Sequence, residues 1–320
     1  MNPLARCLAI ALLAAAPFAP AQDFPTRPIR LVVPQGPGSG ADVVSRMLAE
    51  RMGAELRQAV VIDNKPGANG VIASNAVMKE PPDGYTIFLT SVSLVSFNEH
   101  LYRNVPYTMK DFTFIAPVAE ASFVLVASQA SGIRTWADLV QKAKAKPDTL
   151  TFASGGMGNS THLYTEMIAR RSGFTLRHVP YKGSGPALTS VVAGETDVMT
   201  STSAAAMGQI LGGRVVALAV PGDVKAPQLP QVPLLKELNP NIPPLPGWYA
   251  LVGPARMDPR IVQKLAAAVD KFLADPAIRA KLTEQFLVPI PGTAASIQKR
   301  GEAESALWGG FIRELNVQPE

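Results

Sequence analysis

Apolar residues in the first third of the chain follow two different spacings. Ile29–Val33, Val60–Ile62 and Tyr85–Leu89 are short apolar runs bounded by turn residues, a pattern typical of buried strands. Between these runs, apolar residues recur every three or four positions over Ala41–Leu56 and Val71–Lys79, which predicts helices that bury one face. Strands that alternate with helices form parallel sheets covered on both faces. The first third is therefore predicted to be an α/β unit.

The same alternation restarts in the second third and indicates another α/β unit. Strands or helices are predicted over Phe112–Val118, Phe123–Ser128, Trp136–Ala145, Leu150–Ala153, Ser160–Arg171, Leu176–Val179, Asp197–Thr200 and Val215–Val220. A proline-rich stretch over residues 221–246 predicts little regular structure beyond Leu234–Leu238. The last part predicts a strand over Trp248–Val252 and helices over Pro259–Ala274, Pro276–Phe286 and Ala294–Leu315.

Three strand-to-helix turns are rich in glycine and hydroxyl groups. They cover Pro34–Gly40, Ser154–Asn159 and Pro180–Gly185, and the helix after the third turn is predicted to have Pro186 at its first helical position. A helix N-terminus exposes free backbone N–H groups, which attract anions. Because ligands of parallel sheets bind at the carboxyl ends of the strands, the three turns are predicted to converge on one small acidic molecule.

The composition fits a soluble globular protein with room for two domains. The chain has 320 residues, of which 47% are hydrophobic and 17% charged, and its formal net charge is +5. The basic residues are scattered and form no tract interleaved with aromatic residues, so nucleic acid is not expected as a partner.

Residues 1–21 have the features of a secretory signal peptide. Arg6 supplies the positive charge, Cys7–Ala16 is apolar but too short to span a bilayer, and Ala19–Ala21 fits the rule for cleavage between small residues. Cleavage near Ala21 removes Cys7, the only cysteine. The sequence therefore predicts a thiol-free protein in the bacterial periplasm.

Seven motifs occur in series along the rest of the chain. They are FPTRPIRLVVP (residues 24–34), PGSGAD (37–42), PPDGYT (81–86), TFASGG (151–156), STHL (160–163), HVPYKG (178–183) and GETDVM (194–199). In this order they resemble the Bug family, the periplasmic solute receptors of tripartite tricarboxylate transporters. One such motif is a weak signal, whereas the whole series is specific.

The resemblance implies a type II periplasmic-binding-protein fold, in which two α/β domains are joined by two crossovers around a central cleft. The crossovers are expected near Glu120–Phe123 and Gly247–Tyr249. Domain 1 would then be discontinuous, with residues 22–121 and 247–320, and domain 2 would cover residues 122–246.

The resemblance also implies a receptor that captures a small carboxylate: a dicarboxylate, a tricarboxylate, an aromatic acid or an amino acid. The receptor would be a monomer that delivers this acid to the membrane components of a tripartite tricarboxylate-type transporter. No enzymatic activity, cofactor or metal is implied. Backbone N–H groups and hydroxyls are expected to hold the carboxylates, and the first two glycine turns indeed contain no Lys or Arg.

The candidate ligand-binding residues combine the three turns with polar residues at neighbouring strand ends. One carboxylate is expected at the N-terminus of the helix after Ser39, and the far end of the ligand at the turns of domain 2. Lys182 either contacts the ligand or is solvated, and Asp197 either pairs with a ligand amine or caps a turn. The full set is Gln35, Gly38, Ser39, Gly40, Ala41, Thr90, Ser91, Ser154, Gly155, Asn159, Ser160, Thr161, Tyr181, Lys182, Gly183 and Asp197.

The first glycine turn departs from the family pattern at Gln35, at Gly36 before Pro37 and at Ser39, which replaces a glycine, and the second turn departs at Met157. Gln35 replaces an aromatic residue, which removes an apolar wall and adds a hydrogen-bond donor and an acceptor. Met157 stands where a polar residue is common. Discrimination between acids is therefore expected at Gln35, Met157, Asn159 and the residues that line the cleft within Thr200–Ala204.

The alternative interpretation is a periplasmic hydrolase that uses a Ser/His pair. Ser154, Ser160, Ser184 and three histidines supply the residue types, but the glycines beside Ser184 do not have the Gly-x-Ser-x-Gly spacing. His162 and His178 are expected to be partly buried structural residues, because no partner acid or base is apparent. The spacing of the three histidines suits no metal site.

Overall fold

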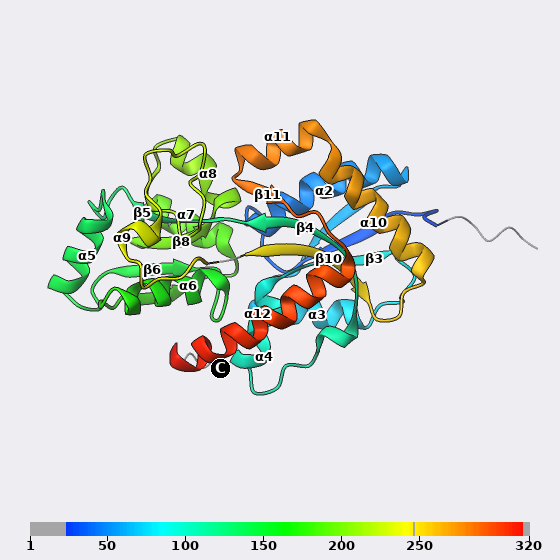
Figure 1. Ribbon diagram of the computed structural model, residues 1–320, viewed down its shortest axis with the longest axis horizontal. Helices are drawn as coiled ribbons and strands as arrows, with labels where there is room; N and C mark the ends of the chain where they lie inside the picture. Colours follow the sequence, from blue (N-terminus) through cyan, green and yellow to red (C-terminus); the bar gives the residue numbers. More distant parts are fainter. Residues whose placement is uncertain (1–23, 246, 316–320) are drawn as a thin grey trace, which may run out of the picture.

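Two separate β-sheets, each covered by helices, form two lobes that lie side by side (Figure 1). The computed structural model describes residues 24–245 and 247–315, so the predicted signal peptide lies outside the described residues. The chain passes to the second lobe between Ala121 and Phe123 and returns just before Trp248. The two sheets confirm the prediction of two α/β units.

The first lobe contains a six-stranded sheet in the order β11-β4-β10-β3-β1-β2. Strand β1 is parallel to β2 and β3, whereas β10 runs antiparallel between β3 and β4. The strands are β1 (Ile29–Val33), β2 (Val60–Asn64), β3 (Thr86–Ser91), β4 (Phe112–Ala121), β10 (Trp248–Pro254) and β11 (Leu287–Pro289). The helices are α2 (Gly40–Leu56), α3 (Val71–Met78), α4 (Asn98–Leu101), α10 (Pro259–Ala274), α11 (Pro276–Glu284) and α12 (Ala294–Leu315), with short turns η1 (Ala68–Gly70), η2 (Ser93–Phe97) and η3 (Met109–Asp111). Every residue of β3 and β10 is buried, as expected for strands covered on both faces.

The second lobe contains a five-stranded sheet in the order β7-β6-β8-β5-β9. Strand β6 is parallel to β7 and β8, and β5 is antiparallel to β8 and β9. The strands are β5 (Phe123–Ser128), β6 (Thr151–Ser154), β7 (Arg177–Pro180), β8 (Val198–Thr202) and β9 (Val215–Ala219). The helices are α5 (Trp136–Ala145), α6 (Ser160–Arg171), α7 (Ser184–Ala193), α8 (Ser203–Leu211) and α9 (Leu235–Leu238). Across the described parts of both lobes, no helix combines the length and apolarity needed to cross a bilayer.

Local sequence signals explain where several helices begin. Thr135 and Asp138 form a capping box at α5, and Asp258 caps α10 directly before a proline. Asn159 caps α6, because its side-chain oxygen accepts a hydrogen bond from the Thr161 N–H. The cap fixes the Asn159 side chain at the carboxyl edge of the second sheet.

Three elements differ from the prediction. Helix α8 was not predicted, because its small apolar residues lack amphipathic spacing even though alanine favours helices. Helix α7 begins at Ser184, so Pro186 is its third residue rather than its first. Proline is tolerated there because the N–H groups of a first helical turn have no acceptor within the helix. Strand β11 has three residues, too few to show a period.

An aromatic cluster joins the lobes beside the crossovers. The ring of Tyr164, on α6, lies 4.9 Å from that of Phe123 and 5.3 Å from that of Trp308, on α12. Phe97 of the first lobe lies 5.0 Å from Trp308. These buried rings belong to one apolar core that continues from one lobe to the other, so α12 packs against both.

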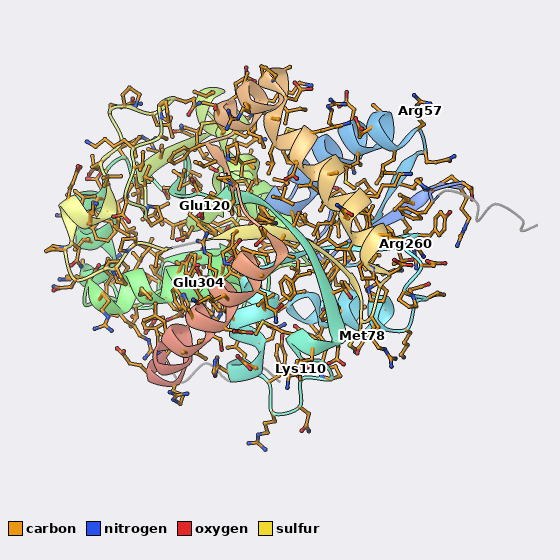
Figure 2. All side chains as sticks on the ribbon, turned by 45° about the vertical axis from the view of Figure 1, so that its right-hand side comes forward. Arg57, Met78, Lys110, Glu120, Arg260 and Glu304 are labelled. Carbon is orange, nitrogen blue, oxygen red and sulfur yellow. The ribbon has the colours of Figure 1, made fainter. Side chains whose placement is uncertain are left out.

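A charged network ties α12 to both crossovers. Arg300 donates two hydrogen bonds to the carboxylate of Glu120, at 2.6 and 3.1 Å, and one to Glu304 at 2.8 Å. Glu304 also accepts a 2.7 Å bond from the indole N–H of Trp248, the first residue of the returning strand. In Figure 2, Glu120 and Glu304 lie where the lobes meet, whereas Arg260 lies on the outer surface.

We expect Arg300→Met to lower the free energy of unfolding by roughly 1–2 kcal/mol, because two partly buried carboxylates lose their cation. This is less than the cost of breaking a fully buried pair, since the Arg300 side chain keeps 28% exposure. Arg260→Met is the control: its side chain is 89% exposed, so this variant should lose much less of the free energy of unfolding. Urea unfolding measures both. Equal losses in the two variants would contradict a structural role for the network.

Candidate functional site

A cavity of about 270 Å³ lies between the two lobes. Turns at the carboxyl ends of β1, β2, β6 and β7 line it, as the rule for ligand sites in α/β sheets predicts. Of the sequence-predicted residues, the cavity brings together Gln35, Gly155, Asn159, Tyr181, Lys182 and Gly183. The other lining residues are Pro34, Pro66, Gly67, Ala68, Asn69, Gly70, Leu94, Tyr102, Gly156 and Met157.

The turn after β1 contributes Gln35. Its backbone carbonyl accepts a 2.8 Å hydrogen bond from the side chain of Asn64, at the end of β2, which fixes the turn. Its side-chain oxygen is buried and has no hydrogen-bond partner within the described chain. A buried oxygen without a partner is costly, so the side-chain oxygen of Gln35 can accept a hydrogen bond from a molecule in the cavity.

The N-terminus of α2 does not line this cavity. The Gly38 N–H donates to the Asp42 carboxylate at 3.0 Å, and the Ser39 hydroxyl accepts from the Asp42 N–H at 3.2 Å. Burial tends to raise the pKa of Asp42, but hydrogen bonds from Arg46, Gly38 and Asn64 lower it below its ordinary value. A carboxylate of the protein, ionised near pH 7, therefore occupies the helix N-terminus, where the sequence predicted a ligand carboxylate.

Gly40 and Ala41 likewise lie away from the cavity, inside the contact between the lobes. A Cβ atom on Gly40 would lie 2.5 Å from the Thr202 hydroxyl of the second lobe and 2.9 Å from the Tyr249 hydroxyl. Ala41 is buried within α2. Gly40 is thus required for packing between the lobes rather than for contact with the cavity.

Most backbone N–H groups of the turn after β6 donate to acceptors within the protein. This differs from the expectation that they hold a ligand carboxylate. The acceptors are the Thr161 hydroxyl for Gly155 (2.8 Å), the Ser154 hydroxyl for Gly156 (3.1 Å), His162 Nδ1 for Gly158 (3.1 Å), the Gly156 carbonyl for Asn159 (3.1 Å) and the Ser93 hydroxyl for Ser160 (3.2 Å). Ser154, Ser160 and Thr161 therefore shape this turn, and its Asn159 side chain faces the cavity.

The turn after β2 was not among the predicted site residues. The Asn69 side chain donates to the Gly158 carbonyl of the second lobe at 3.1 Å and to Asn98 at 2.6 Å. Its oxygen accepts a 3.3 Å bond from the Asn159 amide. Ala68 and Asn69 both have φ of +44°, in the left-handed region that few non-glycine residues adopt. The position of this turn after a parallel strand was the sequence signal that could have identified it.

The turn after β7 contributes Lys182, the one cationic residue in the cavity lining. Lys182 is exposed, and its ammonium makes no hydrogen bond or ion pair with any described residue. The Gly183 N–H donates to the Gly155 carbonyl at 3.1 Å, which joins two of the glycine turns. Tyr181 and Tyr102 add phenol groups, and no carboxylate lines the cavity. The electrostatics therefore favour an anion.

The lobes touch backbone to backbone beside the cavity. A Cβ atom on Gly185 would lie 2.5 Å from the Pro37 carbonyl oxygen, and one on Gly183 would lie 3.0 Å from the Gly36 nitrogen. Gly183 also has φ of +115°, which side chains rarely adopt. The structure thus shows the cleft closed, with glycines where the lobes meet.

Three other predicted residues lie away from the cavity. Thr90 lines a different cavity inside the first lobe, and Ser91 pairs with Tyr249 within the sheet. Asp197 precedes β8 at the end opposite the cleft, and its carboxylate accepts hydrogen bonds from the Thr151 N–H and hydroxyl at 2.7 and 2.8 Å. Asp197 therefore joins the start of β8 to the start of β6, a contact between neighbouring strands rather than a ligand contact or a local turn cap.

Two stacked histidines support the turn after β6. The rings of His162 and His178 lie 4.0 Å apart, and Phe152 stacks on His178 at 4.7 Å. The Ser154 hydroxyl lies 2.6 Å from His178 Nε2. Burial lowers the pKa of His162 to about 3, helped by the charge of His178, and burial lowers the pKa of His178 to about 4. Both rings are therefore neutral near pH 7. Among the described residues, no cluster of three or more His, Cys, Asp or Glu side chains suits a metal ion.

Comparison with known proteins agrees with this architecture. The sequence model of the tripartite tricarboxylate transporter family receptor matches residues 44–317. Protein BugT of Bordetella pertussis is 31% identical over 301 residues, which cover 93% of this chain and 92% of BugT.

Two solved structures have the same fold over nearly the whole chain. The periplasmic binding protein BugD is 27% identical, with a TM-score of 0.89 over 93% of this chain and 100% of BugD. The R. palustris protein Rpa4515 with adipate is 30% identical, with a TM-score of 0.88 over 93% of this chain and 100% of its own. The family model, the relative and the fold confirm the resemblance to the Bug family, and the chain belongs to the tripartite tricarboxylate transporter family receptors, solute receptors with the two-lobed α/β fold of periplasmic binding proteins.

Proposed function

We propose that this receptor captures a small dicarboxylate in the cavity between its lobes. The observation that supports the proposal is the lining itself, which combines the Lys182 ammonium with amides and phenols and contains no carboxylate. The volume of about 270 Å³ equals roughly nine water molecules, room for an acid of about ten heavy atoms. Adipate, which accompanies Rpa4515 in its solved structure, is an acid of this kind.

Side chains, rather than the N–H groups of the turn after β6, hold the carboxylates in this proposal. Both hydrogens of the Asn69 amide are used within the protein, so Asn69 orients its neighbours and donates nothing to the ligand. The Asn159 amide keeps one free hydrogen, and the Gln35 amide and Lys182 supply further donors. Hydrogen bonds to a charged carboxylate are stronger than neutral ones.

Binding without turnover is part of the same proposal. Ser154 and His178 form a close Ser–His contact, but Ser154 is fully buried and its hydroxyl already bonds to Gly156. In the described chain no carboxylate orients His178, whose low pKa makes it a poor general base near pH 7. The pair therefore supports a turn, not a hydrolase.

The cellular setting completes the proposal. Residues 1–21 direct export, cleavage near Ala21 releases a periplasmic monomer, and the loaded receptor docks on membrane components of a tripartite tricarboxylate-type transporter. Residues 22–121 and 247–320 form one domain and residues 122–246 the other. They close by a hinge at the two crossovers.

Closure should depend on the absence of a side chain at Gly185. Gly185→Ala places a methyl group against Pro37 across the cleft, so we expect the acid to bind roughly tenfold or more weakly, as for overpacking. Small-angle scattering of the acid-bound protein should give a larger radius of gyration than for the parent. The control is Gly208→Ala, because a Cβ atom on this helical glycine would meet nothing within 4 Å. Unchanged affinity in Gly185→Ala would show that closure does not need this contact.

The stacked histidines should make stability fall in acid. Their pKa values are lower in the folded chain, about 3 and about 4, than the ordinary 6.5, so only the unfolded state binds protons between these values. Their contribution is complete above pH 6.5 and is lost as the pH falls toward 4. Urea unfolding at pH 7 and pH 4.5 should show a smaller loss in the double variant His162→Asn, His178→Gln than in the parent. An identical loss would contradict the shifted pKa values.

Calorimetric titration with adipate tests the function directly. The parent should bind adipate and leave it chemically unchanged, and Lys182→Met should weaken binding about tenfold by removing one charge-assisted contact. Lys264→Met, at an exposed lysine on α10, is the control and should bind like the parent. If no acid in a panel of dicarboxylates, tricarboxylates, aromatic acids and amino acids binds, or if adipate is consumed, the proposal is wrong.

A further inference from the structure

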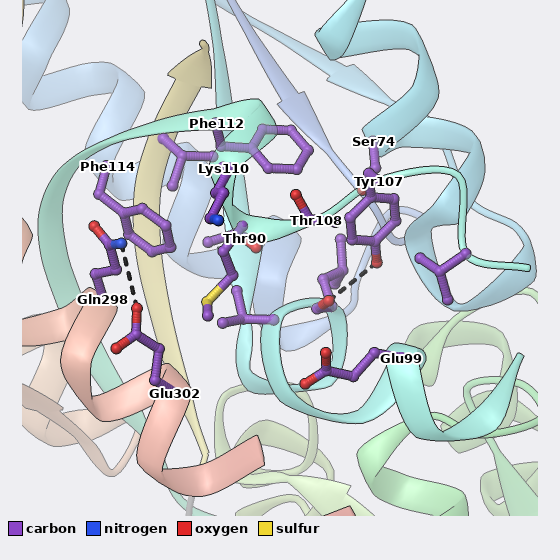
Figure 3. Close-up of a pocket in the computed structure, with 15 residues that line it drawn as sticks. Ser74, Thr90, Glu99, Tyr107, Thr108, Lys110, Phe112, Phe114, Gln298 and Glu302 are labelled. Carbon is purple, nitrogen blue, oxygen red and sulfur yellow. Dashed lines mark hydrogen bonds between the residues drawn. The ribbon is translucent and has the colours of Figure 1, made fainter. Parts of the chain in front are cut away.

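A second cavity, of about 190 Å³, lies inside the first lobe and is separate from the cleft. It lies between β3, β4 and β10 on one side and η2, η3 and α12 on the other. Figure 3 shows side chains from all these elements pointing into one space around Thr90. Nothing in the proposed transport function uses this space.

Hydroxyl groups form the floor of the cavity. The Tyr107 hydroxyl is satisfied, since it donates to the Leu94 carbonyl at 3.0 Å and accepts from Asn98 at 2.7 Å. Thr90 is 3% exposed and makes no side-chain hydrogen bond with any described residue. Because the Thr90 hydroxyl lines the cavity and has no partner within the described chain, it offers a donor and an acceptor to a molecule there. The Ser74 hydroxyl, at the same cavity, is buried and also lacks a partner among the described residues.

The walls are apolar. Phe112 and Phe114 of β4 present their rings, and Val252 of β10 lies between them and Thr90 along the sheet. In Figure 3 the Phe114 ring lies to the left of Thr90 and the Phe112 ring above it, with Lys110 between them. Walls of this kind favour a flat hydrocarbon ring by burying its surface.

Charged groups surround the rest of the cavity. Glu99 and Glu302 carry carboxylates, and Lys110 carries one ammonium, so the local charge is negative. Gln298 binds Glu302 at 3.4 Å. Two carboxylates against one ammonium disfavour an anion, which distinguishes this cavity from the cleft.

We propose that this cavity is a second binding site, for an uncharged single-ring phenol whose hydroxyl bonds to Thr90 while its ring lies against Phe112 and Phe114. The size fits, because an apolar protein cavity of about 150 Å³ holds benzene. The remaining volume accommodates one small substituent. The site is independent of the cleft and of the acid that the cleft binds.

The probe for this site is p-cresol, with toluene as its counterpart that lacks the hydroxyl. Calorimetric or NMR titration of the parent should give a dissociation constant for p-cresol in or below the millimolar range, and weaker binding of toluene by roughly fivefold. Thr90→Val keeps the shape of the side chain and removes its hydroxyl. This variant should bind p-cresol roughly fivefold more weakly than the parent and toluene no more weakly.

Thr86→Val is the matched control, since it makes the same change four residues earlier on β3 and outside the cavity. It should bind p-cresol like the parent, and melting temperatures of both variants establish that they are folded. The proposal is overturned if p-cresol does not bind the parent at millimolar concentration. It is also overturned if Thr90→Val and Thr86→Val bind p-cresol equally well.

Discussion

The structure depends on one close approach, the contact of backbone with backbone where the two lobes meet. Gly36 and Gly183 face each other across the cleft, and Gly185 lies against Pro37. Because no side chain separates these segments, the turns after β1 and β7 can enclose a cavity only a few atoms across. The position of Lys182 beside that cavity follows directly from the glycine that succeeds it.

Contacts at the crossovers position the two lobes so that this backbone contact forms. The Arg300 network links both crossovers to α12. The ring of Trp308 packs against Tyr164, so the same helix also contacts the second lobe. Polar and apolar contacts thus meet on a single helix near the crossovers. In the proposed hinge closure, small rotations at the crossovers would open or close the cleft, because the lobes themselves are tightly packed.

Spacing of apolar residues was enough to predict the two α/β units, because buried strands and one-sided helices follow from local sequence. Gln35, Asn159 and Lys182 could also be placed, since they follow strands whose carboxyl ends share an edge. The missed parts depend on contacts distant in sequence. Whether a backbone N–H group is free to bind a ligand depends on whether a distant residue supplies an acceptor. The Ser160 N–H, for example, donates to the Ser93 hydroxyl. The positive φ values of Ala68 and Asn69 could not be predicted, because the spacing of apolar residues does not depend on them.

The glycine contact also separates two properties of the proposed site. Closure would rely on main-chain atoms, whereas the choice of acid would rely on side chains such as Gln35 and Met157. Substitution of one lining side chain would therefore change the acid that binds and leave the main-chain contact in place. In this scaffold, ligand choice and closure would be adjustable separately because they depend on different atoms.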